Sequence, residues 1–573
     1  MTFRFASATC GVLLAALASG LSACGVPGKL AKITDLVANG ESRDLRKRPE
    51  GARPSSPERP AILVLAFDGV GRDLLYDMLR HGKLPALAAL LGGEGGKLPH
   101  AHLDERLLAT MPSSTMAAWT TAMTGLTPSQ HGVTGNEFFI REERKLGAPA
   151  PVSFHDSKPT LMIYTDAYMD ALKKGPSVYD RIREKDPDVL AWVAMHQVFS
   201  GADRLLVTKP TILASAFEHA VVAVAKKVEG AARPTRDAYQ KLDEQIVDVV
   251  VHELEKGTLP DVLTVYLSGT DLYAHVAEEG PEEAQHKYLA EVVDPAIAKL
   301  TARLRERGAL EDRYVVVTAD HGHTEVVYDA QHALDTVDEG DPPNLMKKAG
   351  YRVRPFRMDV SEKEDFDAVY VAGGATAMLY VADRSACAKP GDPCDWKKPP
   401  RYEEDVLPLA EAFFQGDASG ALVPELKGTL DAVLTRRPRA FAEVDLPFEV
   451  YVGGGKTIPV ETWLQEHPHP TYVHMAARLR ALAVGPRGER AGDVLLLAHN
   501  GDRDTPKDRF YFASLYRSWH GSPSKRDSEI PLIVAHPRKT AESLGAVVTK
   551  VLGDAPYQQK VTDLLLALRF GEK

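Results

Sequence analysis

Short apolar runs that alternate with helix-like segments constrain the fold of this chain more than any other feature. From Ala61 onward these runs have the length of fully buried strands, and they occupy residues 61–67, 189–195, 262–268 and 314–319. The segments between them have helical periodicity, including 72–91 and 281–307, and Pro295 should kink the second. Such alternation predicts an α/β fold, with a mainly parallel sheet sandwiched by helices.

Two stretches depart from this alternation. Residues 39–60 are charged and rich in Pro, Gly and Ser, so we expect a flexible tether within 24–60. Residues 325–510 carry many prolines and glycines, and we interpret them as a large inserted cap over the sheet. The main domain would then consist of residues 61–324 and 511–573, which is possible in a chain of 573 residues.

The first residues have the features of an export signal. Arg4 precedes a short apolar run over residues 10–19, which is too short to span a bilayer stably. Residues 21–24 (LSAC) resemble the lipobox of bacterial lipoproteins, which implies a signal peptide over 1–23 and a lipid on Cys24. That resemblance implies a cell-envelope protein, periplasmic or facing the outer membrane, whose contact with the membrane is the lipid alone. An ordinary secretory signal that contains a cysteine is the alternative.

The cysteines and the net charge indicate a disulfide and argue against one class of partner. Cys387 and Cys394 remain besides Cys10 and Cys24, and an oxidising compartment favours a disulfide between them over two free thiols. Lys and Arg number 69 against 79 Asp and Glu, a net charge of −10. We therefore expect no binding to nucleic-acid polymers, which usually requires a basic face.

Asp and His residues follow the predicted strands, at the sheet edge where open α/β proteins bind ligands. They are Asp68, Asp271, His275, Asp320, His321 and His520. Carboxylates and imidazoles without thiolates suit zinc or a similar divalent ion. The ligand types alone do not distinguish zinc from manganese or iron. Each residue alone has an ordinary alternative as a turn residue, a surface ion pair or a loop histidine.

Thr115 occupies a position that favours phosphate chemistry. Residues 117–123 have helical composition, and Gly125 is placed to end that helix. Thr115 would then lie at or just before a helix N-terminus, where backbone N–H groups and the helix dipole attract phosphate. A bound metal can lower the pKa of such a hydroxyl and make it a nucleophile. The alternative is that Thr115, Ser113 or Ser114 only caps the helix.

This segment is similar to the nucleophile motif of the phosphodiesterase/nucleotide pyrophosphatase branch of the alkaline phosphatase superfamily. The matching residues are Pro112, Thr115, Thr124, Gly125, Pro128, His131, Gly132 and Asn136. The strand-end Asp, the Asp-x-x-x-His, the Asp-His-Gly and the final His-Gly follow in the family's order. The resemblance covers about residues 61–140, 260–325 and 515–540, and it implies an alkaline phosphatase-like fold.

The resemblance also implies the arrangement of the site. One metal ion would be bound by Asp68, Thr115, Asp320 and His321, and a second by Asp271, His275 and His520. Zinc is the expected ion at both positions. Thr115 would attack phosphorus, Asn136 would donate a hydrogen bond to a non-bridging oxygen, and water would release the phosphothreonine. His131 would position its turn, and we expect His323 to be exposed on the Asp-His-Gly-His turn rather than to lie behind the ligands.

The predicted function is hydrolysis of small-molecule phosphate esters, above all phosphodiesters or nucleotide pyrophosphates. A phosphomonoesterase of the same fold is the alternative, with Lys158 as the candidate extra cation. A phosphoryl-group transferase and an inactive binding lipoprotein are more remote alternatives. The natural substrate stays open because we expect specificity to lie in the cap, which matches no known pattern, and the oligomeric state stays open too.

Overall fold

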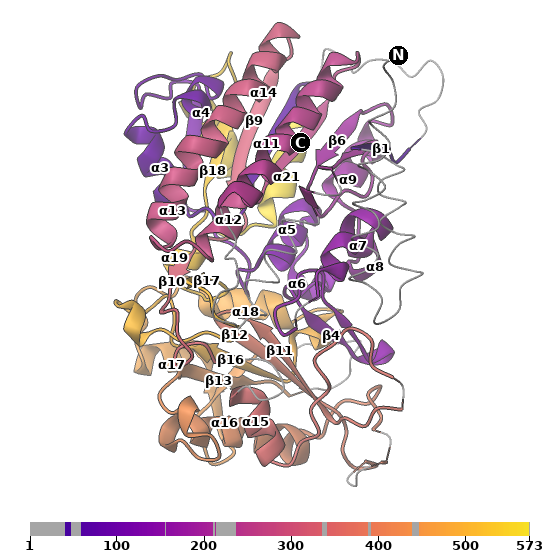
Figure 1. Ribbon diagram of the computed structural model, residues 1–573, viewed down its shortest axis with the longest axis vertical. Helices are drawn as coiled ribbons and strands as arrows, with labels where there is room; N and C mark the ends of the chain where they lie inside the picture. Colours follow the sequence, from indigo (N-terminus) through magenta and orange to yellow (C-terminus); the bar gives the residue numbers. More distant parts are fainter. Residues whose placement is uncertain are drawn as a thin grey trace, which may run out of the picture.

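The computed structural model describes residues 41–46, 59–154, 156–209, 212–213, 236–334, 341–361, 363–387, 391–392, 394–437 and 446–571. The predicted signal peptide, Cys24 and most of the predicted tether lie outside these residues. Among the described helices, none combines the length and the apolar character that crossing a bilayer requires. Figure 1 shows two sheet-containing halves that follow one another along the long axis of the molecule.

The first half contains an eight-stranded sheet. Its order is β1-β7-β6-β8-β2-β9-β18-β3; the five strands from β7 to β9 are parallel, and β1, β18 and β3 are antiparallel to their neighbours. The strands are β1 (Ser42–Asp44), β2 (Ala61–Phe67), β3 (Ala101–Asp104), β6 (Ala191–Ala194), β7 (Arg204–Leu206), β8 (Val262–Leu267), β9 (Arg313–Ala319) and β18 (Leu532–Ala535). The predicted α/β class with a mainly parallel sheet is confirmed.

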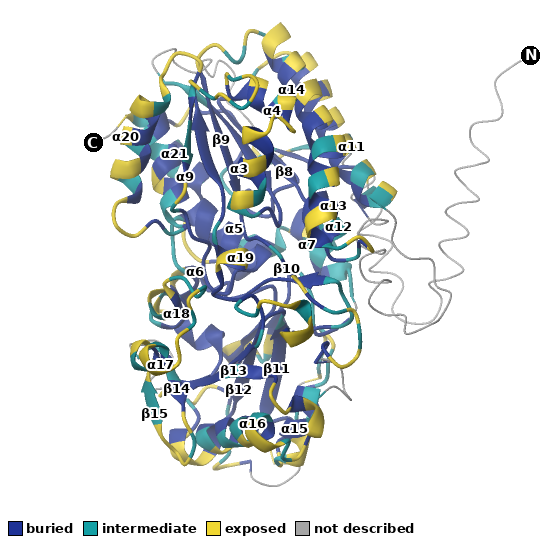
Figure 2. Ribbon diagram, turned by 90° about the vertical axis from the view of Figure 1, so that its left-hand side faces the viewer, coloured by how far each residue is buried: buried dark blue, intermediate teal, exposed yellow. Residues whose placement is uncertain are grey.

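Helices cover both faces of this sheet. Figure 2 shows dark, buried strands between two helical layers whose exposed residues face outward. One layer contains α4 (Pro85–Leu90), α11 (Arg236–Glu255), α13 (Pro281–Tyr288) and α14 (Asp294–Glu306), and the other contains α9 (Val178–Lys185), α20 (Ala541–Leu552) and α21 (Lys560–Phe570). Burial on both faces explains why strands such as β2 are continuously apolar rather than alternating.

Two predicted helices are interrupted. The segment 72–91 forms α3 (Arg72–Arg80) and α4, because Gly82 adopts a left-handed conformation (φ 65°) and Pro85 starts a new helix. The segment 281–307 passes from α13 through a π-helical turn, η2 (Leu289–Val293), into α14. Pro295 lacks an N–H group, so the regular hydrogen-bond ladder cannot continue through it.

The second half corrects our interpretation of residues 325–510 as a cap over the first sheet. It contains a six-stranded antiparallel sheet in the order β11-β12-β16-β13-β14-β15. The strands are β11 (Ala368–Gly373), β12 (Thr376–Val381), β13 (Leu430–Thr435), β14 (Glu449–Tyr451), β15 (Thr457–Pro459) and β16 (Val494–Ala498). This sheet lies beyond one end of the first sheet, not over a face of it (Figures 1 and 2).

Both faces of the second sheet are buried. Helices α15 (Asp341–Lys348) and α16 (Leu407–Ser419) pack against one face, and α17 (Val460–Glu466) and α18 (Met475–Ala483) pack against the other.

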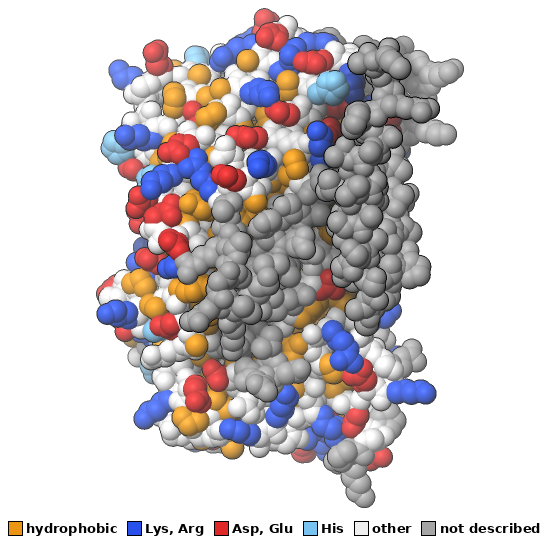
Figure 3. All heavy atoms as spheres, viewed as in Figure 1, with side chains coloured by type: hydrophobic (Ala, Val, Ile, Leu, Met, Phe, Trp, Pro, Cys, Tyr) orange, Lys and Arg blue, Asp and Glu red, His pale blue; other side chains and the backbone are white. Residues whose placement is uncertain are grey.

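A disulfide joins Cys387 to Cys394 in the connection after β12. On the face of the molecule seen in Figure 3, Lys and Arg side chains are interspersed with Asp and Glu outside the grey atoms.

Part of the predicted tether is structured. Residues 42–44 form β1, which pairs antiparallel with β7 at the edge of the first sheet. Arg204 on β7 also forms an ion pair with Asp44, at 2.8 Å. The prediction of a flexible tether is wrong for these three residues, because an edge strand offers unpaired backbone groups to which a short segment can bind whatever its composition.

Candidate metal centre

Three neighbouring parallel strands bring the predicted ligands to one edge of the first sheet. Phe67, the last residue of β2, is paired with Leu267 on β8 and with Ala319 on β9. Asp68 and Asp320 therefore follow adjacent strand ends. Strand β8 leads through Ser268 into the short helix α12 (Gly269–Ala274), which carries Asp271 and is followed by His275. The carboxyl ends of parallel strands thus concentrate ionisable groups where such sheets bind ligands.

The remaining predicted residues come from a helix and a hairpin. Thr115 is the first residue of α5 (Thr115–Thr124), which ends at Gly125 in a left-handed conformation, as predicted. His520 follows β17 (Ser518–Trp519), which pairs with β10 (Thr324–Glu325). The second sheet helps to hold His520, because the Ala375 N–H in the β11–β12 turn donates to its carbonyl oxygen at 3.0 Å.

Asp68, Asp320 and His321 form a first buried cluster together with Thr115. The Nε2 atom of His321 lies 3.3 Å from Asp320 Oδ2, 3.5 Å from Asp68 Oδ1 and 3.2 Å from Thr115 Oγ1. Neither Asp68 Oδ1 nor Asp320 Oδ2 has a hydrogen-bond partner among the described residues. A buried carboxylate oxygen without a partner is costly, so this arrangement of four donors fits a bound cation.

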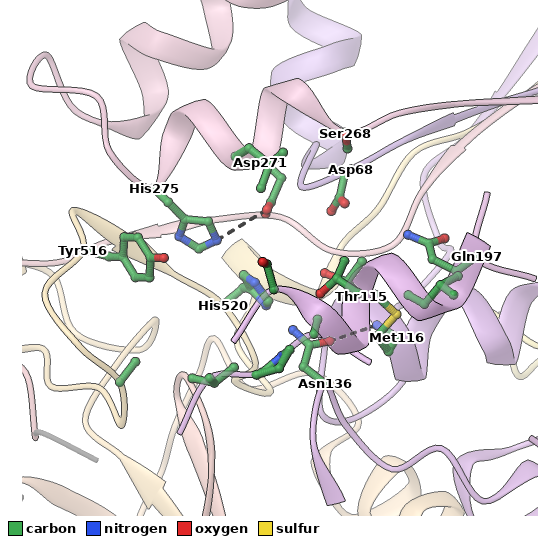
Figure 4. Close-up of a pocket in the computed structure, with 18 of the residues that line it drawn as sticks. Asp68, Thr115, Met116, Asn136, Gln197, Ser268, Asp271, His275, Tyr516 and His520 are labelled. Atoms are coloured by element: carbon green, nitrogen blue, oxygen red, sulfur yellow. Dashed lines mark hydrogen bonds and ion pairs between the residues drawn. The ribbon is translucent and has the colours of Figure 1, made fainter. Parts of the chain in front are cut away.

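Asp271, His275 and His520 form a second cluster beside the first. Asp271 Oδ2 lies 3.4 Å from His275 Nε2, and one ligand atom of each of the three residues lies within 4.8 Å of the others. The rings of His321 and His520 stack with their centroids 3.6 Å apart, so the two clusters are adjacent. Figure 4 shows Asp68, Thr115, Asp271, His275 and His520 around one opening.

Backbone carbonyls orient the imidazoles of these clusters. The Nδ1 atoms of His275, His321 and His520 lie 2.7 Å, 3.0 Å and 2.8 Å from the carbonyl oxygens of Ser518, Gly322 and Ser113. A neutral imidazole that donates from Nδ1 has its Nε2 lone pair free for a metal ion. All three rings therefore present the nitrogen that a ligand must use.

Without a cation, the charged forms of two of the three carboxylates, Asp68 and Asp320, are disfavoured. Burial raises the pKa of Asp68 well above its usual value, and the nearby carboxyls of Asp320 and Asp271 raise it further. Burial also raises the pKa of Asp320. Burial acts in the same direction on Asp271, but the neighbouring His275 and His323 outweigh it and hold that pKa well below its usual value. The donor types and the concentrated negative charge both fit divalent metal ions.

A cavity of about 180 Å³ opens beside the two clusters. Asn136 lines it, and its Oδ1 accepts a hydrogen bond from the Met116 N–H at 3.0 Å, as drawn in Figure 4. Residues 150–164 and 513–519 supply most of the other walls, and none of the described lining residues is Lys or Arg. None belongs to 325–510, the region in which we expected specificity to lie.

The family profile of type I phosphodiesterase/nucleotide pyrophosphatase matches residues 62–397. The chain belongs to this family. It is therefore an enzyme that hydrolyses phosphate esters, and the family is metal-dependent. The matched range contains Thr115, Asn136 and all the expected ligands except His520. The resemblance inferred from the motifs is confirmed at the level of this phosphodiesterase family, and the remote alternative of an inactive binding protein is not supported.

Two solved structures similar to this phosphodiesterase are of murine ectonucleotide pyrophosphatase/phosphodiesterase 5, one of them an inactive variant in complex with AMP. Each is 12% identical and covers 89% of this chain and 94% of the murine chain, with TM-scores of 0.46 and 0.45. No curated protein matches the sequence.

His323 of this phosphodiesterase does not lie where we expected. Its side chain is 1% exposed, and Nε2 lies 2.7 Å from Asp271 Oδ1. The prediction of an exposed residue is wrong because the chain turns directly from β9 into β10, which packs His323 against α12 and β17. The second histidine of the Asp-His-Gly-His motif was the sequence signal that could have indicated this position.

Two further residues at the site belong to none of the sequence motifs. Tyr266 lies within the apolar run of β8 and donates a hydrogen bond from its hydroxyl to Asp68 Oδ2. Gln197 follows β6, lines the cavity and is 3% exposed. In the sequence, an aromatic residue within a buried strand predicts core packing. Tyr266 lies at the site because β8 pairs with β2, which the sequence alone does not show.

Two other predicted residues stand apart from the clusters. Lys158 starts α7 (Lys158–Asp166) and is not among the described cavity-lining residues, although its neighbour Ser157 is. His131 is buried, with Nε2 2.9 Å from Thr121 Oγ1 and with Nδ1 accepting the Val133 N–H at 3.1 Å. These contacts agree with the structural role expected of His131.

We expect protein purified without chelators to contain close to two equivalents of divalent metal, because two donor clusters are preformed. Elemental analysis measures this content. Asp320→Asn, which weakens one charged donor, should lower the content towards one equivalent. Asp312→Asn, at the opposite end of β9, should leave it unchanged. Metal-free protein whose activity survives exhaustive treatment with EDTA would contradict the expectation.

Proposed function

We propose that this enzyme cleaves phosphodiesters or nucleotide pyrophosphates through a phosphothreonine intermediate on Thr115, with two divalent ions, zinc being the expected metal. The observation that carries the proposal is the position of Thr115 Oγ1. It lies 3.2 Å from His321 Nε2 and beside the oxygens of Asp68 and Asp320 that have no hydrogen-bond partner in the described part of the chain. Asp68, Asp320 and His321 would hold one ion, and Asp271, His275 and His520 the other.

The start of α5 is suited to a phosphoryl group. Its N-cap residue, Ser114, makes no side-chain capping bond, and the Met116 N–H is donated to Asn136 Oδ1 instead. The other N–H groups of the first turn and the helix dipole favour an anion beside Thr115. Bound divalent ions would lower the pKa of a coordinated hydroxyl and offset charge on the phosphoryl oxygens.

The chain's own groups then account for two displacement steps. Thr115 loses its hydroxyl proton and its Oγ forms a bond to phosphorus, while the bond from phosphorus to the leaving oxygen breaks; that oxygen leaves as an alcohol that takes up a proton or, from a pyrophosphate, as a phosphate. In the second step a water oxygen loses a proton and bonds to phosphorus, the bond to Thr115 Oγ breaks, and Thr115 Oγ takes up a proton, which restores the hydroxyl. Because Asn136 Oδ1 accepts the Met116 N–H, its amide N–H groups are available to a non-bridging oxygen.

Thr115→Ala should lower kcat/KM by about a thousandfold or more, roughly 4 kcal/mol, because it removes the attacking oxygen. Thr115→Ser should retain part of the rate. Mass spectrometry of wild-type enzyme that is acid-quenched during turnover of bis-(p-nitrophenyl) phosphate should detect a p-nitrophenyl phosphoryl group on the peptide that contains Thr115, because the diester keeps one ester group when the other leaves.

Ser114→Ala is the matched control, since the Ser114 hydroxyl is buried without a hydrogen-bond partner among the described residues. We expect this variant to retain most of its activity. If Ser114→Ala is inactive while Thr115→Ala is active, the nucleophile is assigned to the wrong residue.

The charge of the cavity favours diesters over monoesters. A monoester dianion carries one more negative charge than a diester, and sites built for it usually add fixed cations. The described cavity walls hold no Lys or Arg, and Asp156 adds a carboxylate. Extra negative charge on the substrate would therefore meet no fixed cation among the described side chains of the cavity.

We expect kcat/KM for an aryl phosphodiester to exceed that for the matching monoester by about tenfold or more, roughly 1.4 kcal/mol. Steady-state assays with bis-(p-nitrophenyl) phosphate and p-nitrophenyl phosphate measure the ratio. Lys158→Ala should change neither rate. A preference for the monoester that disappears in Lys158→Ala would replace this proposal by the phosphomonoesterase alternative.

We also propose that the enzyme is anchored in the cell envelope by lipid on Cys24, a residue outside the described part of the chain. The LSAC sequence supports this. Metabolic labelling with a fatty-acid analogue should label wild type and Cys10→Ser, whose substitution falls in the removed signal, but not Cys24→Ser. Unlabelled wild-type protein would rule out the anchor.

A further inference from the structure

Each buried carboxylate of the two clusters has one oxygen that already accepts a hydrogen bond. Asp320 Oδ1 accepts the backbone N–H groups of Gly69 and His321, both at 3.0 Å. The corresponding partners of Asp68 and Asp271 are side chains, Tyr266 and His323. In all three residues the other oxygen, Asp68 Oδ1, Asp271 Oδ2 or Asp320 Oδ2, lies 3.3–3.5 Å from an imidazole Nε2.

Tyr266 reaches Asp68 from the neighbouring strand. On β8 it pairs with Ala66 of β2, and Asp68 lies two residues farther along the chain, so both side chains lie on the same face of the sheet. The ring of Tyr266 packs edge-on against Trp119, with centroids 5.9 Å apart, and against His196, at 5.6 Å. With the ring fixed between these two, the phenol hydroxyl is held at Asp68 Oδ2.

His323 is held with similar precision at Asp271. Its Nδ1 lies 3.0 Å from Ser518 Oγ, and its Nε2 lies 2.7 Å from Asp271 Oδ1. The backbone of Gly69 closes this pocket, because a Cβ at that position would lie 2.6 Å from His323 Nε2 and 2.8 Å from Asp271 Oδ1. Gly69 also has φ 68°, so both its conformation and the close approach require glycine.

We propose that Tyr266 and His323 are positioning residues, one for each metal site. Tyr266 donates to Asp68 Oδ2, and His323 donates to Asp271 Oδ1 in the tautomer that carries the proton on Nε2. Each occupies the carboxylate oxygen that is not needed as a ligand, stops rotation of that carboxylate, and leaves a single oxygen to bind the ion. The inference rests on the proposed two-metal function. It assigns roles to two side chains outside the six ligands, and such outer partners typically change metal affinity by about 10–100-fold.

The test measures metal affinity rather than activity. Metal-free protein is titrated with Zn²⁺ in competition with a chromophoric chelator, in two backgrounds that each retain one site. His520→Gln leaves the Asp68 site, and Asp320→Asn leaves the Asp271 site. Tyr266→Phe should weaken the retained ion by about 10–100-fold in the first background and by less than about threefold in the second.

His323→Leu should show the reverse pattern: it should weaken binding of the retained ion by about 10–100-fold in the Asp320→Asn background and by less than about threefold in the His520→Gln background. His323→Gln should recover most of the lost affinity, because its amide N–H can take the place of the imidazole N–H, and it also serves if His323→Leu does not fold. Tyr179→Phe and His536→Leu are matched controls: Tyr179 donates to Thr264 on β8, and His536 contacts Asp312 far from the site. Neither control should change affinity in either background.

Distinct outcomes overturn distinct claims. If wild type binds two ions and both Tyr266→Phe and His323→Leu bind them with unchanged affinity, the positioning roles are wrong and the proposed function stands. If His323→Gln loses the ion as fully as His323→Leu, His323 is itself a ligand and its positioning role is wrong. If wild type binds no divalent ion, the proposed function fails, and this inference fails with it.

Discussion

Three carboxylates buried at one point are the constraint on which the rest of this structure depends. The pairing of β2 with β8 and β9 places Asp68 and Asp320 side by side, and α12 adds Asp271. Burial and the neighbouring carboxyls disfavour the charged forms of Asp68 and Asp320, whereas His275 and His323 favour that of Asp271. Backbone carbonyls orient three imidazoles so that their Nε2 atoms face the site. Hydrogen-bond donors occupy one oxygen of Asp68 and one of Asp271. The remaining ligand lone pairs are therefore directed at two positions. Such convergence is what divalent cations require of a protein.

The parts predicted from the sequence are those encoded locally. Strands buried on both faces are continuous apolar runs, so their ends, and with them Asp68 and Asp320, could be located without a structure. The same holds for Thr115, because the helical composition of residues 117–123, followed by Gly125, places Thr115 at or just before the first residue of α5.

The parts that could not be predicted depend on contacts between distant residues. Strand β12 pairs with β16, more than a hundred residues away, so the second sheet has no short-range hairpin signal at that position. His323 is buried only because α12 and β17 meet at the turn after β9, and Tyr266 has a role only because β8 lies beside β2. The cavity walls formed by residues 150–164 and 513–519 likewise meet only in the folded chain.

The charge of the assembled centre connects these contacts to substrate choice. While the Thr115 hydroxyl keeps its proton, two divalent ions bound by three carboxylates and three neutral imidazoles would leave one net positive charge in a buried site. A phosphodiester brings one negative charge and would neutralise it, whereas a monoester dianion would leave an excess that the described cavity walls, without Lys or Arg, do not offset. In this view the donors Tyr266 and His323 act on selectivity too, because their hydrogen bonds favour the charged forms of Asp68 and Asp271, and so influence the number of charges that the substrate must balance.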